Sequence, residues 1–327
     1  MSYTITQESF ANLTSYWSSS SYRLKWDSVF VLPAWLEVWW REFQPQAELY
    51  LTAVRQDADI IGIAPLQIKE NRASFIGSAD VCDYIDFVVV PGRETDFFNV
   101  LFDDFKGRGV NQLELRPLRP DSTVLTHLVD IARSRKYEVL CHEEEVSVEM
   151  DLPSTWDEYL EILSRKQRHE VRRKLRRLWE EGNVDYRCIE ASGEEVGKFM
   201  DTFLRLFSLS REEKANFMTP QKESFFRSLA GAMAEIGLLR FGIIEIDELP
   251  TSIIMGFDYN DTVYLYNSGY DPQYSSLSVG LLCKVLGLKE SIASGRKKWD
   301  FLKGGEPYKY LLGGREIPIY SCRITLE

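Results

Sequence analysis

Residues 264–282, YLYNSGYDPQYSSLSVGLL, carry the strongest indication of the fold. An apolar strand ends within this stretch, a polar turn follows, and we predict a helix from Ser278 to Ala293. Short turn-forming connectors, Asp247–Pro250 and Asn260–Asp261, precede it and are typical of hairpins. The strands predicted around this segment are 238–246, 251–259, 262–266, 299–302 and 317–324.

Similar apolar periodicity, interrupted by turn-forming residues, extends over the whole chain. In the second half we predict helices over 156–181, 194–207 and 221–236, and a strand over 184–189. In the first half we predict helices over 33–43, 95–106 and 122–134, and strands over 49–54, 60–68, 84–90, 112–115 and 145–150. The chain has 327 residues, enough for two domains at roughly 150 residues each. We therefore predict an α/β (α+β) protein of two domains, residues 1–150 and 151–327, divided near Asp151–Ser154.

One short segment is strongly basic, whereas the rest of the chain is acidic. The net charge is −11, yet residues 164–178, SRKQRHEVRRKLRRL, hold eight basic residues and one acidic residue, a net charge of +7. A general nucleic-acid binder is basic over a whole face, so DNA binding is not expected. On a helix, Arg168 and Arg172 share a face that suits a diphosphate, and RNA or an anionic membrane surface would also fit. The alternative is a solvated helix face paired with nearby acids.

Two further segments could carry chemistry. The helix start near Ser278 could hold a phosphate or pyrophosphate with its free backbone N–H groups, although Ser278 could equally be an ordinary N-cap. In the glycine-rich stretch FLKGGEPYKYLLGG, residues 301–314, Glu306 could act as general base and Tyr308 as acid, with Lys309 beside them for an anionic substrate group. The alternative for this stretch is a surface loop.

The segment DYIDF, residues 83–87, places Asp83 and Asp86 at the entry of a predicted strand. Two carboxylates there could hold an amine or hydroxyl acceptor, or they could be turn residues and salt-bridge partners. The five cysteines are dispersed and only three histidines occur, so neither a disulfide framework nor a metal site is indicated. We expect a reduced, cytoplasmic protein without a metal, since no signal peptide or membrane span is apparent.

As an ordered set, these segments resemble the CelD-like acetyltransferases, a family of the GNAT superfamily that is associated with cellulose or exopolysaccharide biosynthesis and is related to the FemAB peptidyltransferases. The stretches that carry the resemblance are PAWLEVWW, IGIAPL, DYIDF, LSRKQRHEVRRKLRRL, FLRLFSLSREEKANFMT, YLYNSGYDPQYSSLSVGLL and WDFLKGGEPYK, between Pro33 and Lys309.

The resemblance implies two tandem GNAT-like modules, each a mixed, largely antiparallel sheet flanked by helices. GNAT enzymes usually carry (Gln/Arg)-x-x-Gly-x-(Gly/Ala) where the donor phosphates bind, and only the last position matches here. The corresponding residues are Ser275, Ser276, Leu277, Ser278, Val279 and Gly280. A tyrosine often follows the next strand in these enzymes, which supports Tyr308 as the acid.

Together these observations predict an N-acyltransferase that moves an acyl group from acyl-CoA, acetyl-CoA or longer, to an amine. The acceptor would be a small molecule or a cell-envelope precursor, in exopolysaccharide, envelope or lipid biosynthesis, at the inner face of the membrane. Two alternatives stay open. One is a FemAB-like transferase that uses aminoacyl-tRNA, which the acidic body disfavours, and the other is a non-catalytic scaffold or sensor of a polysaccharide synthesis machine.

Overall fold

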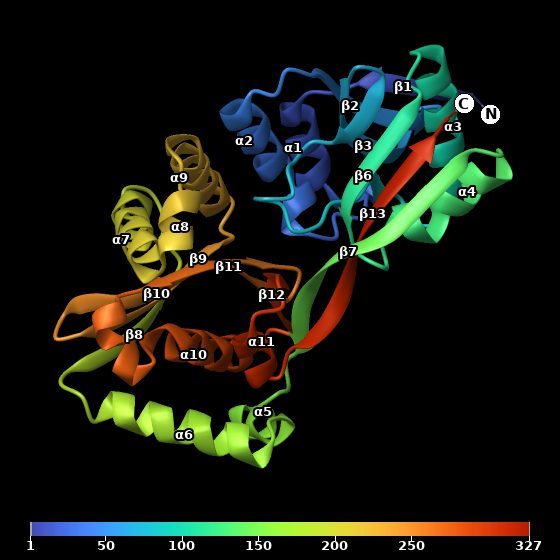
Figure 1. Cartoon of the computed structure of the whole chain (residues 1–327). Coiled ribbons are helices and arrows are strands. Elements are labelled where there is room, and N and C mark those ends of the chain that lie inside the picture. The colour runs from blue at the N-terminus through green and yellow to red at the C-terminus, as the bar shows by residue number, and fades with distance from the viewer. Residues whose placement is uncertain (1, 327) are drawn as a thin grey trace. The chain divides into compact units, whose positions relative to one another are not determined.

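The computed structural model describes residues 2–326, which form two compact units. The first unit contains the chain up to Val146 and the segment from Ile317 onward, and the second runs from Ser147 to Glu316. Both are mixed α/β structures, as predicted (Figure 1).

The first unit is built on a sheet with strand order β1-β2-β3-β4-β6-β13, in which β5 pairs with β3. All of its pairings are antiparallel except that of β4 with β6. Its strands and helices are β1 (Tyr3–Gln7), α1 (Phe10–Ser18), α2 (Pro33–Phe43), β2 (Glu48–Gln56), β3 (Asp59–Lys69), β4 (Arg72–Phe75), β5 (Val88–Val89), α3 (Glu94–Gly107), β6 (Gln112–Leu118), α4 (Val129–Ser134) and β13 (Arg315–Thr325). Short helical turns lie at Ser20–Tyr22, Val29–Val31 and Val124–Leu128.

The second unit has the strand order β7-β12-β11-β10-β9-β8, again with one parallel pair, β11 with β12. Its elements are β7 (Glu138–Asp151), α5 (Trp156–Ile162), α6 (Arg165–Trp179), β8 (Val184–Ile189), α7 (Glu195–Ser210), α8 (Glu212–Phe217), α9 (Pro220–Glu235), β9 (Leu239–Ile246), β10 (Leu249–Tyr259), β11 (Thr262–Tyr270), η4 (Pro272–Leu277), α10 (Val279–Ala293), β12 (Lys298–Lys303) and α11 (Pro307–Leu311).

The two units repeat one order of elements. Each has a strand, a group of helices, a three-stranded antiparallel meander, a helix, and a strand parallel to the last meander strand. In each unit, the strand that completes the sheet comes from the other half of the sequence. Strand β6 pairs with the C-terminal strand β13, and β12 pairs with the end of β7. The predicted boundary after residue 150 falls at the end of β7, whereas the compact units divide within β7 and return residues from Ile317 to the first unit.

Helices cover both faces of the sheet in the second unit. Helix α10 packs against one face and helices α7 and α9 against the other (Figure 1). On the α10 side, Leu282 and Trp299 belong to a buried apolar cluster that also includes Val171 and Leu178 of α6. On the opposite side, the ring of Tyr266 in β11 stacks on Phe226 with ring centroids 5.3 Å apart.

Several predicted elements differ in extent from those in the structure, and two differ in kind. The single helix predicted over 156–181 is two helices, because Leu163 is extended and Ser164 opens α6 with a capping box in which Gln167 is the reciprocal partner. The strand predicted over 84–90 is reduced to Val88–Val89. The residues before Val88 form a loop instead, in which the carboxylate of Asp86 accepts hydrogen bonds from Thr123.

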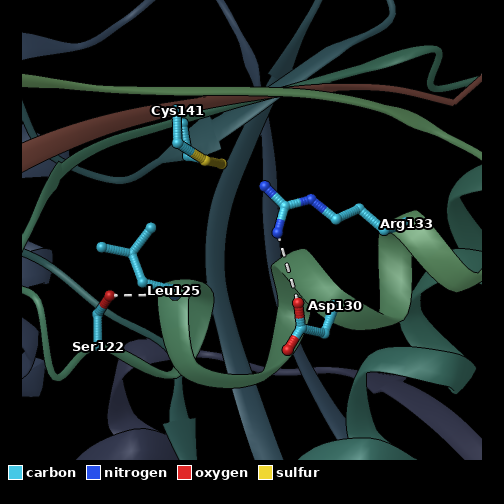
Figure 2. The surroundings of a disulfide bond; sticks show 6 residues. Ser122, Leu125, Asp130, Arg133 and Cys141 are labelled. Carbon is cyan, nitrogen blue, oxygen red and sulfur yellow. Dashed lines mark hydrogen bonds and ion pairs between the residues drawn. A yellow bond between two sulfur atoms is a disulfide. The ribbon is translucent and has the colours of Figure 1, made fainter.

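The expectation that the cysteines are unpaired is wrong at one position. Cys141 of β7 and Cys322 of β13 form a disulfide whose Cα atoms are 4.2 Å apart (Figure 2). The residues are separated by 181 positions in the sequence, so their spacing gave no indication of the pairing. Cys82 and Cys283 are free and buried, and Cys188 is free and exposed.

Candidate functional site

The parallel strands β11 and β12 diverge within the second unit. In the part of the chain that the structure describes, they pair only from Thr262 to Tyr264, although β11 continues to Tyr270. Strand β12 bends at this point, where Leu302 adopts a left-handed conformation with φ of 62° and donates its backbone N–H to the carboxylate of Asp300 at 2.8 Å. The result is an interrupted sheet in which β11 beyond Tyr264 no longer pairs with β12.

The junction from β11 to α10 lies at this end of the sheet. Asp271 caps the short helix η4, and Ser278 then adopts a left-handed conformation with φ of 57° directly before α10. The Ser278 hydroxyl makes no cap to its own helix and instead lies 2.6 Å from the ammonium of Lys174 on α6. Among the described residues, the N–H groups of Val279 and Gly280 have no hydrogen-bond acceptor, so the start of α10 can receive an anion.

The six residues predicted for the phosphate site differ in their environment. Ser275 and Ser276 are exposed in η4, whereas the side chains of Leu277 and Val279 are buried in the apolar cluster. Gly280 has a packing role as well, because a Cβ atom there would lie 2.9 Å from the ring of Tyr270. Phosphate contacts at this junction would therefore come from backbone N–H groups and Lys174, a residue that the sequence did not single out.

Lys309 organises the loop that follows β12. Its side chain is 2% exposed, and its ammonium donates to the carbonyl oxygens of Leu302, Lys303 and Gly304 at 2.7–2.9 Å. The ammonium also lies 2.9 Å from the carboxylate of Glu306. Because an ammonium has three N–H groups, Lys309 has no donor left for a substrate anion and instead fixes the shape of the loop.

Glu306 and Tyr308 lie in contrasting surroundings. The carboxylate of Glu306 is 48% exposed and ion-paired with Lys309, so it lacks the burial on which the predicted role as general base depends. The pKa of Tyr308 is raised well above its usual range by burial and by the nearby charge of Glu306, which keeps the phenol protonated. Its ring packs edge-on against Phe301 of β12.

Two lysines, one beside Tyr308 and one beside the end of β11, were not predicted from the sequence. Lys284 on α10 is 7% exposed, donates to the Gly280 carbonyl oxygen at 2.9 Å, and lies 5.0 Å from the centre of the Tyr308 ring. Lys214 on α8 donates to the carbonyl oxygen of Ser268 in β11. Burial, together with neighbouring positive charges, lowers the pKa of Lys214 to about 7 and that of Lys284 to about 8.

The predicted basic run forms helix α6, but its arginines are not equivalent. Arg172 is exposed, whereas Arg168 donates to the carbonyl oxygen of Leu163 at 3.3 Å and has a buried Nε atom. Arg173 forms a bidentate pair with Glu170 at 2.9 and 2.8 Å. The helix therefore combines structural contacts with an exposed basic surface.

The two aspartates of the first unit are not placed as a matched pair. Asp86 is half-buried, and its oxygens accept from the backbone N–H groups of Phe87 and Thr123 and from the Thr123 hydroxyl at 2.6–2.9 Å. Burial raises the pKa of Asp86 to about 7. These contacts give Asp86 a role in holding the turn before residues 124–128, and Asp83 is half-buried on the preceding loop.

Comparison with known proteins agrees with this arrangement. Residues 165–310 match the model of the acetyltransferase (GNAT) domain family. The chain has a tandem GNAT-like fold. A structure of FemX superimposes with a TM-score of 0.64 at 12% identity, covering 97% of this chain and 96% of FemX. A comparison with curated proteins finds no match.

Two further solved structures share the GNAT-like fold. L-PGS from Bacillus licheniformis gives a TM-score of 0.56 at 9% identity, covering 89% of this chain and 90% of that one. A tandem GNAT protein of the clavulanic acid biosynthesis pathway gives 0.50 at 11% identity, with 98% of both chains covered. Within residues 2–326 there is no helix long and apolar enough to cross a membrane, and no group of three or more metal-ligating side chains.

Proposed function

We propose that the second unit transfers an acyl group from an acyl-CoA to an amine. The observation that supports this most directly is the divergence of β11 from β12 beside the unoccupied N–H groups of α10. An extended pantetheine arm can pair with an open strand edge as a further strand would. The phosphates of the donor would then bind at Val279 and Gly280, next to the ammonium of Lys174.

The reaction requires two proton movements. The neutral amine attacks the thioester carbonyl carbon, the carbon–sulfur bond breaks, and the thiolate takes up one proton while the amine nitrogen loses one. Tyr308 is the proposed proton donor because it follows β12, the strand that diverges from β11, and its phenol is protonated at neutral pH. Glu306 is exposed and ion-paired, so we assign removal of the amine proton to water and expect most of the acceleration to come from positioning.

The acceptor that we propose is a small amine or a cell-envelope precursor, and the cellulose or exopolysaccharide setting remains part of this proposal. A second candidate donor, aminoacyl-tRNA, is favoured by one observation, the exposed basic surface of α6. The same surface suits an anionic membrane. A net charge of −11 over the chain opposes close approach of an extended RNA.

Thiol release tests the proposed activity. The purified chain is mixed with acetyl-CoA, a long-chain acyl-CoA or aminoacyl-tRNA and a panel of amines, and free thiol and acylated amine are measured together. Amine-dependent thiol release from a CoA thioester supports the proposal. Acylation from aminoacyl-tRNA alone contradicts it in favour of the second candidate, and no transfer from any donor favours a scaffold.

A further inference from the structure

Lys214 and Lys284 approach the divergent end of β11 from opposite faces of one sheet. Lys214 is carried by α8, on the face that α7 and α9 cover, and Lys284 by α10 on the other face (Figure 1). Lys214 is bonded to Ser268 near the end of β11, and Lys284 is bonded to Gly280 in the first turn of α10. Aromatic rings line both ammonium groups, Phe207 at 4.6 Å from Lys214 and Tyr308 at 5.0 Å from Lys284.

The charges around these two lysines do not balance. Lys284 and Arg211 both act on Lys214, and Arg211 also acts on Lys284, so three cations repel one another. The carboxylate that acts on both lysines is Glu306, and it is already paired with Lys309 at 2.9 Å. Lys284 is buried and Lys214 is half-buried, whereas Arg211 is exposed. Two like charges at least partly removed from water are costly unless an anion compensates them.

Hydrogen-bonding capacity is also left over. An ammonium carries three N–H groups, and among the described residues Lys214 and Lys284 each donate to one acceptor, a backbone carbonyl oxygen. The remaining donors of Lys284 lie beside Tyr308, where the proposed transfer takes place, and those of Lys214 lie beside Ser268 near the end of β11. Lys174 donates instead to the hydroxyl of Ser278, where the donor phosphates are proposed to bind.

We infer that Lys214 and Lys284 form an oxyanion subsite that binds a carboxylate or phosphate group of the amine acceptor. The inference rests on the proposed function and narrows its substrate class to amines that carry an anionic group near the nitrogen. The anion supplies the missing counter-charge and fixes the amine beside the thioester carbonyl. A neutral amine of the same size gains neither effect.

Calorimetric titration with inorganic phosphate and with acetate tests the subsite directly. We expect at least one probe to bind the wild-type chain at pH 7, and Lys214→Met and Lys284→Met each to weaken that binding at least tenfold. Lys198→Met, an exposed lysine on α7, serves as control and leaves it unchanged. Methionine preserves most of the side-chain volume, and circular dichroism verifies folding. Failure of both probes to bind, or binding that neither variant weakens, overturns the inference.

Repeating the titration with saturating CoA shows whether the two lysines bind an anionic group of the acceptor or the phosphates of the donor. We expect the probe to bind as before, because the subsite belongs to the acceptor. Competition by CoA that Lys284→Met abolishes would assign the lysines to the donor and overturn the acceptor assignment. Absence of CoA binding contradicts the proposed function instead, while the titrations without CoA still decide whether the subsite exists.

Steady-state kinetics test independently whether the enzyme prefers amines that carry an anionic group. We expect glycine or phosphoethanolamine to exceed ethylamine in kcat/KM by at least tenfold, and the two methionine variants to reduce that ratio while Lys198→Met preserves it. Equal values for charged and neutral amines in the wild type would overturn the inference.

Discussion

The ammonium of Lys174 lies 2.6 Å from the hydroxyl of Ser278, which joins the basic helix α6 to the first turn of α10. Lys174 is also 3.6 Å from Glu170 and its side chain is 21% exposed. A cation at a helix N-terminus is unfavourable toward the helix dipole, and Glu170 compensates part of that cost. Under the proposed function, a donor phosphate would bind both the ammonium and the helix start.

Replacing Lys174 tests that role. We predict that Lys174→Met weakens CoA binding about tenfold, because a charge-assisted contact to phosphate contributes roughly 1.5–3 kcal/mol in folded proteins. Calorimetry measures the change. Lys166→Met, on an exposed turn of the same helix, is the matched control and should bind CoA as the wild type does. Equal affinities for all three proteins would remove Lys174 from the donor site.

Tyr308 is expected to act in turnover rather than in binding. Tyr308→Phe should lower kcat by roughly 10²-fold, the lower range for loss of acid–base catalysis, and leave KM for the donor nearly constant. Glu306→Gln should change kcat less than tenfold, since that carboxylate is exposed. Tyr310→Phe, on the same helix with its hydroxyl on Glu316, is the control. Wild-type kcat in the Tyr308 variant would show that protonation comes from elsewhere.

Stability should depend on pH through Lys284, which is buried, and Lys214, which is half-buried. Their pKa values, about 7 for Lys214 and about 8 for Lys284, lie below the ordinary 10.5. Between these values the unfolded chain binds more protons than the folded chain, so stability rises with pH and is lowest below about pH 7. Lys284→Met should therefore raise the free energy of unfolding at pH 6 by about 1–4 kcal/mol and flatten its increase toward pH 10.

Urea unfolding at pH 6, 7.5 and 9 provides the measurement. Lys198→Met should retain the wild-type dependence because that side chain is exposed. A Lys284→Met protein with the same pH slope as the wild type would mean that Lys284 is solvated, which would also weaken the case for the anion subsite.

The exposed surface of α6 distinguishes the candidate donors. Arg172→Ala combined with Arg176→Ala should leave the midpoint of thermal unfolding nearly unchanged, because exposed charges contribute little stability. Arg168→Ala should lower it, since Arg168 is bonded to Leu163. For a CoA donor, affinity should fall only gently with salt, whereas tRNA would steepen the log–log slope by about 0.7 for each phosphate neutralised. Tight tRNA binding with a steep slope that the double variant removes would favour the aminoacyl-tRNA alternative.

The disulfide can be verified by counting thiols. In denaturant without reductant we predict three reactive thiols, from Cys82, Cys188 and Cys283, and five after reduction. Mass spectrometry of a non-reduced digest should recover the peptide that joins Cys141 to Cys322. Five thiols without reductant would contradict the pairing, and would fit the reduced state that is usual in the cytoplasm.

Local patterns predicted most of the second unit correctly. The helix from Pro33 to Phe43 in the first unit and the strand from Val184 to Ile189 match the structure residue for residue, because proline position and apolar alternation are read locally. The predicted domain boundary assumed that each domain is one continuous segment of the chain, whereas the first unit also includes residues from Ile317 onward. The exchange of β7 and β13 is set by pairing between distant segments and has no local signal.

The candidate site was predictable only where a motif exists. The helix start after β11 stood out because a strand, a polar turn and a helix adjoin in sequence. Lys214 and Lys284 lie 70 positions apart on separate helices, and an isolated lysine in a sequence is indistinguishable from a solvated one. Lys309 was predicted to bind substrate because of its position in the sequence. In the structure its ammonium donates to three backbone carbonyl oxygens of the adjoining segment instead.

Direct titration of acetyl-CoA into the wild-type chain tests whether the second unit binds an acyl-CoA donor. We predict one saturable site per chain with a dissociation constant in the range of ordinary KM values, about 1 µM to 1 mM. Lys174→Met should weaken this binding and Lys166→Met should leave it unchanged. No heat from acetyl-CoA, together with saturable binding of aminoacyl-tRNA under the same conditions, would contradict it.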